Sequence, residues 1–512
     1  MNLYQLFSFS AARYPSYPAL IHGNRKTTYS QLSEEVNQVA SSFHRLGLKS
    51  GDRVMVLLKN RMETAVVFWA IQKLGAVFAP INLRSSTEEI LYCVNDLETK
   101  FIVFEDASKH LIRNQKYVER PLLIGLEDSL GDMSYGELLN KVIVEVEPYP
   151  AHDDDLAVIL YTSGTSGKPK GVPRSHINEY ASTMAHIIQC SYQPFERTYG
   201  IPTLSHTIGL RSLLAMTFLN GVYVPFPDFD AYKALKMIPE EKISCLFLTP
   251  TMYHDIVTHP YAKAVDFSTI HTIVYSGGPM PSHLIQKCGE LMAPDFFVNQ
   301  YGSTEIYTFS TFPDVRKKPG CAGKAGIHQR IRLVNPNSKW KKPLVWLTEK
   351  GEIGEILVDI SSPEAFKGYW NRPDVTRKAI KDGWYFTGDV GFIDEEGDLH
   401  VVGRVDDMII SSGENIYPQE IEKVLAEHHS VREAVVVGED DERWGQIVTA
   451  FIVSDDKELT PQALDYFCKM HKRLPNYKRP RNYIFIKEIP KNSAGKILRR
   501  QLKEGNYGEV AF

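Results

Sequence analysis

Residues 161–172 read Tyr-Thr-Ser-Gly-Thr-Ser-Gly-Lys-Pro-Lys-Gly-Val and follow the apolar run 156–160. The glycines allow backbone N–H groups to turn toward an anion, the hydroxyl groups add donors, and Lys168 and Lys170 supply positive charge. The stretch therefore predicts a loop that holds the phosphates of a nucleotide. It is not a Walker loop, because that pattern needs glycine at the position of Thr162 and serine or threonine at Pro169. A solvated loop between two strands is the alternative interpretation.

Four further segments rich in glycine, hydroxyl and charged residues follow in order along the chain. They are Gln300-Tyr-Gly-Ser-Thr-Glu305, Trp384-Tyr-Phe-Thr-Gly-Asp389, the long stretch 403–422 and Pro490-Lys-Asn-Ser-Ala-Gly-Lys-Ile-Leu498. Each alone is weak evidence, because a Gly-Asp pair is usually a turn and a basic stretch is usually solvated surface.

Together, the five segments and their order resemble the signature segments of the adenylate-forming superfamily. This superfamily contains acyl-CoA synthetases, peptide-synthetase adenylation domains and beetle luciferases. The resemblance covers essentially the whole chain. The stretches 442–446 and 477–480 are most similar to aryl-CoA ligases of the 4-chlorobenzoate type.

The composition limits the kind of protein this chain can be. With 512 residues and 43% apolar content, it is long enough for two or more domains with sizeable cores. The formal net charge of −4, from 58 basic and 62 acidic residues, gives no polybasic character, so nucleic acid is not expected as a partner.

Neither the N-terminus nor the cysteines indicate export. The N-terminus has no basic region before an apolar core, and the longest apolar stretch, 65–81, is interrupted by Gln72 and Lys73. We therefore expect no signal peptide and no membrane span. The six cysteines lack Cys-x-x-Cys spacing, which is typical of a reduced cytoplasmic protein without zinc or disulfides.

Strands and helices are predicted to alternate through the first three hundred or so residues. Thr28-Tyr-Ser-Gln31 is a capping-box pattern, and the apolar residues that follow recur at helical spacing up to Gly47. A second helix is predicted at 63–74, and strands at 53–58, 101–104, 245–248, 273–275 and 296–298. This alternation indicates an α/β fold with parallel sheets covered by helices and with ligand-binding loops at the strand ends.

Beyond about residue 340 the pattern changes to short strands, at 355–358 and 399–402, separated by glycine turns such as Asp382-Gly383. Strands at 408–410, 435–437, 447–453 and 483–486 then combine with helices at 418–428 and 461–472. We therefore expect a large N-terminal ATP- and acyl-binding domain of α-covered β-sheets plus a β-rich subdomain at 1–403. A hinge at 404–407 and a small mobile α+β lid domain at 408–512 would follow.

The resemblance implies an ATP-dependent carboxylic acid:CoA ligase, which is an AMP-forming acid-thiol ligase of fatty acid or aromatic acid metabolism. A carboxylate cannot be transferred directly to a thiol, because its leaving group would be oxide or hydroxide. Attack on the α-phosphorus of ATP would give an acyl-adenylate and pyrophosphate, and attack of the CoA thiol would then give a thioester and AMP. The expected cofactor is Mg²⁺, with ATP and coenzyme A as co-substrates.

The resemblance also implies the nucleotide site. Phosphate, adenine and ribose contacts would come from Thr162, Ser163, Gly164, Thr165, Ser166, Gly167, Lys168, Ser276, Gly277, Gly278, Tyr301, Gly302, Thr304, Asp389 and Arg404. Glu305 would bind the magnesium ion that bridges phosphate oxygens. The catalytic residues would be Lys496, Thr304 and His206. Lys496 would bridge the substrate carboxylate and the α-phosphate as charge redistributes.

For the second half-reaction, the resemblance implies rotation of the small domain about Asp406. The CoA contacts would be Arg84, Ser412, Gly413, Trp444, Tyr477 and Arg479. Ser412 departs from many relatives, which have glycine there, so the pantetheine tunnel is expected to be narrower.

The acyl pocket implied by the resemblance is apolar or small in character. Its lining would be His206, Thr207, Ile208, Thr249, Pro250, Gly277, Gly302 and Tyr307. Relatives that activate amino acids carry an aspartate near the His206 segment to pair with the ammonium, and this chain has none. We therefore expect an aryl or medium-chain aliphatic acid.

Three alternatives stay open. An adenylation enzyme could load a carrier protein's phosphopantetheine arm, although no carrier domain follows residue 512 and Arg84 and Arg479 suit the 3′-phosphate of CoA. A non-catalytic nucleotide-binding relative would be favoured by loss of Lys496 or Glu305, and both are present. Luciferase-like oxidation shares the first step, but nothing in the sequence indicates it.

Overall fold

The structure is a computed structural model that describes residues 2–113, 115–127, 131–139, 144–162, 168–335, 346–412, 414–491 and 497–508. The chain forms two compact units. The first contains Met1–Arg330 and Asp359–Tyr385, and the second contains Ile331–Val358 and Phe386–Phe512.

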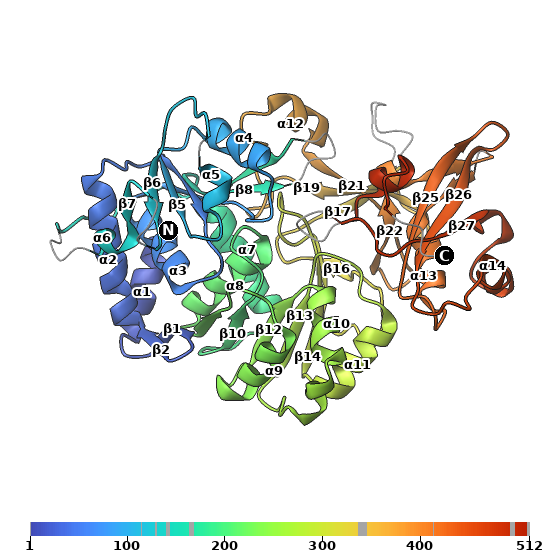
Figure 1. Cartoon of the computed structure of the whole chain (residues 1–512), viewed down its shortest axis with the longest axis horizontal. Helices are drawn as coiled ribbons and strands as arrows, with labels where there is room; N and C mark the ends of the chain where they lie inside the picture. Colours follow the sequence, from blue (N-terminus) through green and yellow to red (C-terminus); the bar gives the residue numbers. More distant parts are fainter. Residues whose placement is uncertain are drawn as a thin grey trace. The chain divides into compact units, whose positions relative to one another are not determined.

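The first unit contains two sheets (Figure 1). The seven-stranded sheet has the order β7 (Met133–Ser134), β6 (Leu122–Gly125), β5 (Phe101–Phe104), β3 (Arg53–Leu57), β4 (Val77–Pro80), β8 (Leu156–Thr162) and β9 (Lys170–Ser175). The nine-stranded sheet has the order β16 (Lys324–Ala325), β15 (Ser310–Phe312), β14 (Phe296–Tyr301), β13 (Thr272–Tyr275), β12 (Cys245–Leu248), β10 (Arg197–Gly200), β11 (Val222–Pro225), β1 (Pro18–His22) and β2 (Arg25–Thr28). Most neighbouring strands are parallel, whereas β8 and β9 are antiparallel.

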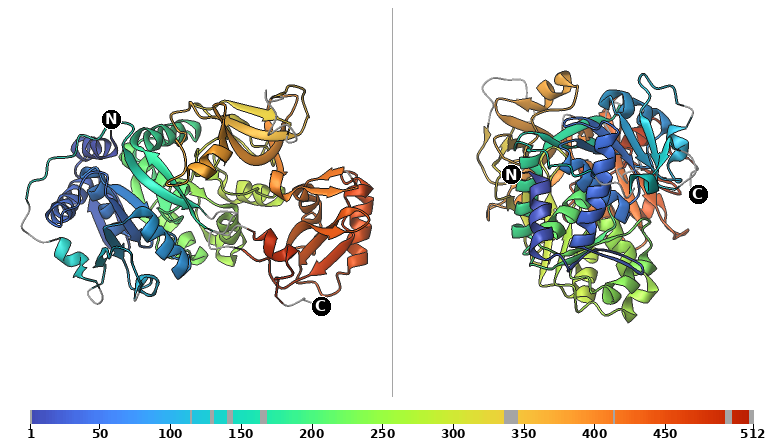
Figure 2. Two further views of the ribbon diagram at one scale, coloured as in Figure 1. Left: turned by 90° about the horizontal axis from the view of Figure 1, so that it is seen from above. Right: turned by 90° about the vertical axis from the view of Figure 1, so that its left-hand side faces the viewer.

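The helices of the first unit are α1 (Leu3–Arg13), α2 (Tyr29–Arg45), α3 (Met62–Lys73), α4 (Thr87–Leu97), α5 (Lys109–Ile112), α6 (Tyr135–Leu138), α7 (His176–Gln189), α8 (Thr207–Phe218), α9 (Ala231–Glu240), α10 (Pro250–Thr258), α11 (Ser282–Met292) and α12 (Pro373–Ala379). The predicted capping box is confirmed: Thr28 accepts from the backbone of Gln31, and the Gln31 side chain accepts from the backbone of Thr28. Helices α1, α2 and α3, in blue, lie side by side (Figures 1 and 2).

Both faces of each of these two sheets are buried, and successive side chains of one strand pack into different hydrophobic clusters. In β3, Val54 and Val56 belong to a cluster that also contains strands of the nine-stranded sheet, while Met55 and Leu57 pack with α4. In the same way, helices α9, α10 and α11 cover the other face of the nine-stranded sheet. This explains why the strands are continuously apolar rather than alternating.

The longest apolar stretch of the sequence forms α3 and β4. Because α3 is buried all round, it lies inside the core that the two sheets share. Among the residues that the structure describes, no helix combines the length and the apolar character needed to cross a bilayer. All six cysteines are buried and free.

The second unit is rich in short strands. Strands β18 (Trp346–Leu347), β17 (Ile331–Val334), β19 (Gly354–Asp359), β21 (Trp384–Ile393) and β22 (Leu399–Arg404) pair in that order. Strand β20 (Ile380–Lys381), which belongs to the first unit, pairs with the first two residues of β21. A further sheet contains β24 (Glu414–Ile416), β23 (Ile409–Ser411), β26 (Gly445–Val453), β25 (Glu433–Asp441) and β27 (Asn482–Phe485). Helices α13 (Pro418–Leu425) and α14 (Pro461–Met470) cover one face of it, and α15 (Arg499–Lys503) packs on the other.

The predicted α/β class is thus confirmed, and the predicted elements occur close to their expected positions. Helix α13 ends at Leu425 and α14 at Met470, two to three residues before the predicted ends at 428 and 472.

Candidate active site

The predicted phosphate loop joins the antiparallel strands β8 and β9. Thr162, the last residue of β8, pairs with Lys170, the first residue of β9. Lys168 lies 5.6 Å from the ring centre of Tyr92, and Lys170 lies 4.9 Å from that of Tyr369. The predicted residues Ser163, Gly164, Thr165, Ser166 and Gly167 lie outside the described residues.

Three predicted segments follow the parallel strands β12, β13 and β14, which are neighbours in the nine-stranded sheet. They are Thr249 and Pro250 at the start of α10, the turn 276–278, and 301–305. Because the carboxyl ends of parallel strands meet at one edge, the structure gathers these segments there. Any larger residue at position 302 would force the backbone of this turn to move, because its Cβ atom would lie 2.1 Å from the carbonyl oxygen of Tyr307.

Glu305 is buried, with 7% of its surface exposed, and several contacts hold it in place. Its Oε1 accepts a hydrogen bond from the Tyr369 hydroxyl at 2.6 Å. Its backbone carbonyl accepts from Nη1 of Arg174 and from the backbone of Phe366, both at 3.0 Å. Thr304, half-buried, precedes it in the same turn.

Arg174 belongs to β9, so it connects the hairpin of β8 and β9, called the phosphate hairpin here after its predicted role, to the Glu305 turn. Its guanidinium is fully buried and forms an ion pair with Glu179 at 2.8 Å. Burial acts to lower the pKa of Arg174, but the nearby Glu179 outweighs it and the pKa is raised. Neither Arg174 nor Tyr369 was predicted, and the β9 sequence Lys-Gly-Val-Pro-Arg-Ser gives no local signal for the role of Arg174.

His206 directly precedes α8, whose first turn contains Thr207 and Ile208. Its Nε2 lies 3.2 Å from Nδ2 of Asn82. Burial, followed by the positive charge of Arg84, lowers the pKa of His206. Arg84 itself is exposed, and its backbone N–H donates to the Asn82 side chain at 2.9 Å.

Tyr307 is only 2% exposed, and its ring lies in a buried cationic cluster. The guanidinium carbon of Arg174 is 3.9 Å from the ring centre, and that of Arg211 is 5.4 Å away. Tyr301 packs edge-on against Phe309, with ring centres 5.1 Å apart.

In the second unit, Asp389 and Arg404 are directly opposite each other on β21 and β22. Nη1 of Arg404 donates to Oδ1 of Asp389 at 2.7 Å, so these two predicted nucleotide-binding residues form one ion pair. Asp406 is exposed in a short 3₁₀ turn, Val405–Asp407.

The predicted CoA residues of the second unit that the structure describes are Ser412, Trp444, Tyr477 and Arg479. The backbone N–H of Ser412 donates to the carbonyl of Trp444 at 2.8 Å, and Arg481 lies 4.3 Å from the Trp444 ring centre. Tyr477 is 52% exposed, and Arg479 forms an ion pair with Asp465. Gly413 and Lys496 lie outside the described residues.

The described part of the chain contains no group of three or more His, Cys, Asp or Glu side chains that could hold a metal ion. A divalent cation at Glu305 would therefore take most of its ligands from phosphate oxygens and water, as magnesium does in nucleotide sites.

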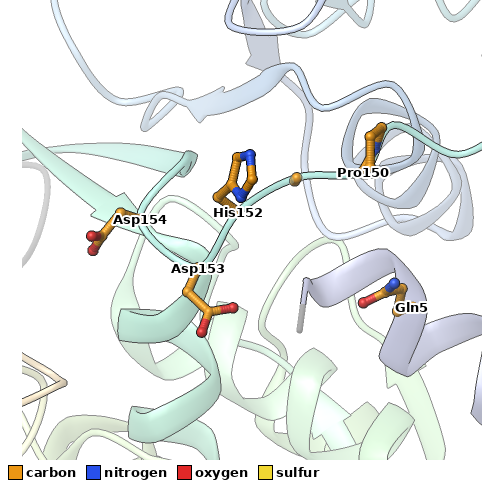
Figure 3. Close-up of a pocket in the computed structure, with 6 residues that line it drawn as sticks. Gln5, Pro150, His152, Asp153 and Asp154 are labelled. Carbon is orange, nitrogen blue, oxygen red and sulfur yellow. The ribbon is translucent and has the colours of Figure 1, made fainter.

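A surface hollow of about 560 Å³ lies away from these residues, lined by Gln5 and 150–154. In Figure 3 the side chains of Asp153 and Asp154 point in different directions. None of the predicted site residues lines it.

The β8–β9 hairpin, which contains the ends of the predicted phosphate loop, is thus hydrogen-bonded to the turn that contains the buried Glu305. The family model described as AMP-binding enzyme matches residues 7–370, and that of the AMP-binding enzyme C-terminal domain matches residues 420–496. The chain therefore belongs to the AMP-binding enzyme family, which confirms the expected membership of the adenylate-forming superfamily.

Relatives of this chain include acid–CoA ligases, as expected from the sequence. Long-chain-fatty-acid–CoA ligase FadD13 of Mycobacterium tuberculosis is 33% identical over 94% of this chain and 93% of its own length. The 4-chlorobenzoate–CoA ligase of an Arthrobacter species is 30% identical over 98% of this chain and 94% of its own.

Solved structures share the fold over almost the whole length. The o-succinylbenzoate CoA synthetase MenE from Bacillus subtilis, in complex with the acyl-adenylate intermediate OSB-AMP, has a TM-score of 0.85 and 29% identity and covers 99% of both chains. The same enzyme in complex with ATP and a magnesium ion has a TM-score of 0.84 and 28% identity and covers 97% of this chain and 99% of its own.

Proposed function

We propose that this chain is an ATP-dependent carboxylic acid:CoA ligase that forms an acyl-adenylate and then an acyl-CoA thioester. The observation that carries the proposal is the fixed geometry around Glu305. Arg174 from the phosphate hairpin and Tyr369 both hydrogen-bond to this residue, so a carboxylate is held beside the loop expected to bind the triphosphate.

In the first half-reaction, the phosphate hairpin and its lysines would bind the β- and γ-phosphates. Thr304 would donate to the α-phosphate, and Glu305 would hold Mg²⁺, which neutralises charge on the phosphate oxygens. The turn 276–278 and Tyr301 would contact adenine, and Asp389, oriented by Arg404, would accept from the ribose hydroxyls.

Lys496 would stabilise the charge that develops between the substrate carboxylate and the α-phosphate. Its loop would then be exchanged for the Ser412 loop by rotation of the region 408–512 about Asp406. Asp406 is exposed in a short turn, a position where a backbone change displaces few contacts.

The acid would be bound by the predicted residues beside His206, at the ends of β12, β13 and β14. The small and apolar character of these residues supports an aryl or medium-chain aliphatic acid. Relatives with fatty-acid and chlorobenzoate specificity are compatible with either class.

For the acceptor we propose free CoA rather than a carrier protein, with Arg84, Trp444, Tyr477 and Arg479 at its nucleotide end. In the structure Arg479 is paired with Asp465, so CoA phosphate would have to compete with that carboxylate.

The experiment that tests the acceptor compares free CoA with a phosphopantetheinylated carrier protein at equal thiol concentration. Purified protein, ATP and Mg²⁺ are incubated with benzoates or medium-chain fatty acids, and thioesters are identified by mass spectrometry. We expect acyl-CoA as the main product. Acylation of the carrier protein alone would establish the alternative function.

A further inference from the structure

Tyr369 joins two parts of the proposed triphosphate site that are far apart in the sequence. Its hydroxyl donates to Oε1 of Glu305 at 2.6 Å, across 64 residues of sequence. Its ring lies 4.9 Å from the ammonium group of Lys170, at the base of the phosphate hairpin. The side chain is 8% exposed, so both contacts are largely shielded from solvent.

The backbone around Tyr369 strengthens this connection. The N–H of Phe366 donates to the carbonyl of Glu305 at 3.0 Å, and the N–H of Trp370 donates to the carbonyl of Gly171 at 2.9 Å. The backbone N–H of Tyr369 itself donates to Oγ1 of Thr376 at 2.9 Å. The segment 366–370 is therefore fixed to the Glu305 turn on one side and to β9 on the other.

We propose that Tyr369 is a positioning residue that orients the Glu305 carboxylate toward a divalent cation bound on the triphosphate. This proposal rests on the function proposed above and adds a residue to it. The carboxylate group of a glutamate can rotate about its side-chain bonds. A hydrogen bond from a hydroxyl group to one carboxylate oxygen fixes the direction in which the second carboxylate oxygen points. Partners of a metal-binding carboxylate act in this way, and their removal typically costs about 10–100-fold in metal affinity.

The ring and the hydroxyl of Tyr369 have separable roles. The hydroxyl acts on the metal through Glu305, whereas the ring face attracts the Lys170 ammonium. Tyr369→Phe removes the hydrogen bonds of the hydroxyl, including the one to Glu305, and keeps the ring, whereas Tyr369→Leu removes both the hydroxyl and the ring.

The direct test is the binding of Mn²⁺, measured by electron paramagnetic resonance, to the full-length protein with a non-hydrolysable ATP analogue. We expect Tyr369→Phe to weaken Mn²⁺ binding about tenfold or more while the analogue binds nearly as tightly as in the wild type. Tyr369→Leu is expected to weaken both. Tyr117→Phe is the matched control, because it also removes a 2.6 Å hydroxyl bond, to the carbonyl of Ile112, outside the proposed site.

A double-mutant cycle separates positioning from a general effect on folding. In the Glu305→Gln background, Tyr369→Phe should cause little further loss of Mn²⁺ affinity, because its effect passes through the Glu305 carboxylate. Equal Mn²⁺ affinity of Tyr369→Phe and wild type, or a full additional loss in the Glu305→Gln background, would overturn the proposal. Because the readout is metal binding, the result is independent of whether any acid is a substrate.

Discussion

The side chain of Asn82 lies between Arg84 and His206 and fixes how the imidazole is protonated. Oδ1 of Asn82 accepts the backbone N–H of Arg84 at 2.9 Å, so the NH₂ group of the same amide is the one that faces Nε2 of His206 at 3.2 Å. An NH₂ group can only donate, so Nε2 must be the acceptor and the neutral ring carries its proton on Nδ1. The loop with a predicted CoA residue is thus hydrogen-bonded to a predicted acyl-pocket residue.

The first prediction concerns the pH at which His206 becomes charged. Burial, followed by the charge of Arg84, lowers its pKa below the ordinary value of 6.5, so the ring stays neutral at neutral pH. Asn82→Asp should raise this pKa, because a carboxylate favours the protonated ring. Histidine NMR titration, with the His206 signal assigned by its loss in His206→Gln, measures the shift.

His328 is the internal control for that titration. Its hydrogen bond to Glu364 raises its pKa, so it should titrate above 6.5 in the same sample. A His206 signal that titrates at or above the His328 signal would contradict the lowered pKa of His206.

The second prediction concerns Gly302. A Cβ atom there would lie 2.1 Å from the carbonyl oxygen of Tyr307, and both atoms belong to the turn that contains Glu305. Gly302→Ala should therefore displace this turn and reduce acid-dependent pyrophosphate release by at least about a hundredfold. Gly136→Ala is the control, because the nearest atom to its Cβ would be 3.7 Å away. Near wild-type release by Gly302→Ala would show that the turn is not part of the site.

The third prediction separates the two half-reactions by means of Lys496. Lys496→Ala should slow adenylate formation much more than thioester formation from preformed adenylate, because its loop is expected to have left the site by then. Single-turnover kinetics with ATP and acid, and separately with synthetic acyl-adenylate and CoA, measure the two rates. An equal loss in both would exclude a role confined to adenylation.

The fourth prediction concerns the acid sensitivity of the fold. His176 is buried, its Nδ1 accepts the backbone N–H of Leu3 at 3.3 Å, and burial lowers its pKa to about 4. Since this folded-state pKa lies below the ordinary 6.5, the unfolded chain binds the proton first, and stability falls as pH drops from 6.5 toward about 4. We expect this group to lower the free energy of unfolding by about 2 kcal/mol when the pH falls from about 7.5 to about 5.

Urea unfolding at the two pH values tests this contribution. His176→Gln should be less stable than wild type near pH 7.5 but should lose less stability on acidification. His271 provides the opposite sign, because the hydrogen bond that its ring donates to the Glu196 carboxylate raises its pKa, and its contribution to stability is lost as pH rises. Identical pH dependence of His176→Gln and wild type would show that His176 does not titrate with unfolding.

Local sequence patterns were sufficient to predict much of the fold. The capping box at Thr28 and the apolar runs of β5 and β12 depend on residues close in sequence, and they occur where predicted. The helix end at Leu425 was missed because the following residues continue the helical pattern without a glycine or proline stop.

The site could be predicted only where a motif contains its own chemistry. Glu305 and Asp389 stand inside recognisable segments. Arg174, Tyr369 and Asn82, in contrast, contact site residues that are 64 or more residues away in the sequence. Such contacts depend on how strands and loops are arranged in space, and no local pattern encodes them. The resemblance supplied roles for residues, and the structure supplied the contacts that hold several of those residues in place.

The most direct measurement of the central claim is acid-dependent exchange of labelled pyrophosphate into ATP, without CoA, over a panel of benzoates and fatty acids. The proposed function predicts exchange with at least one acid, its loss in Glu305→Gln, and conversion of that acid to a thioester once CoA is added. Absence of exchange with every acid tested, by protein that binds ATP, would contradict it.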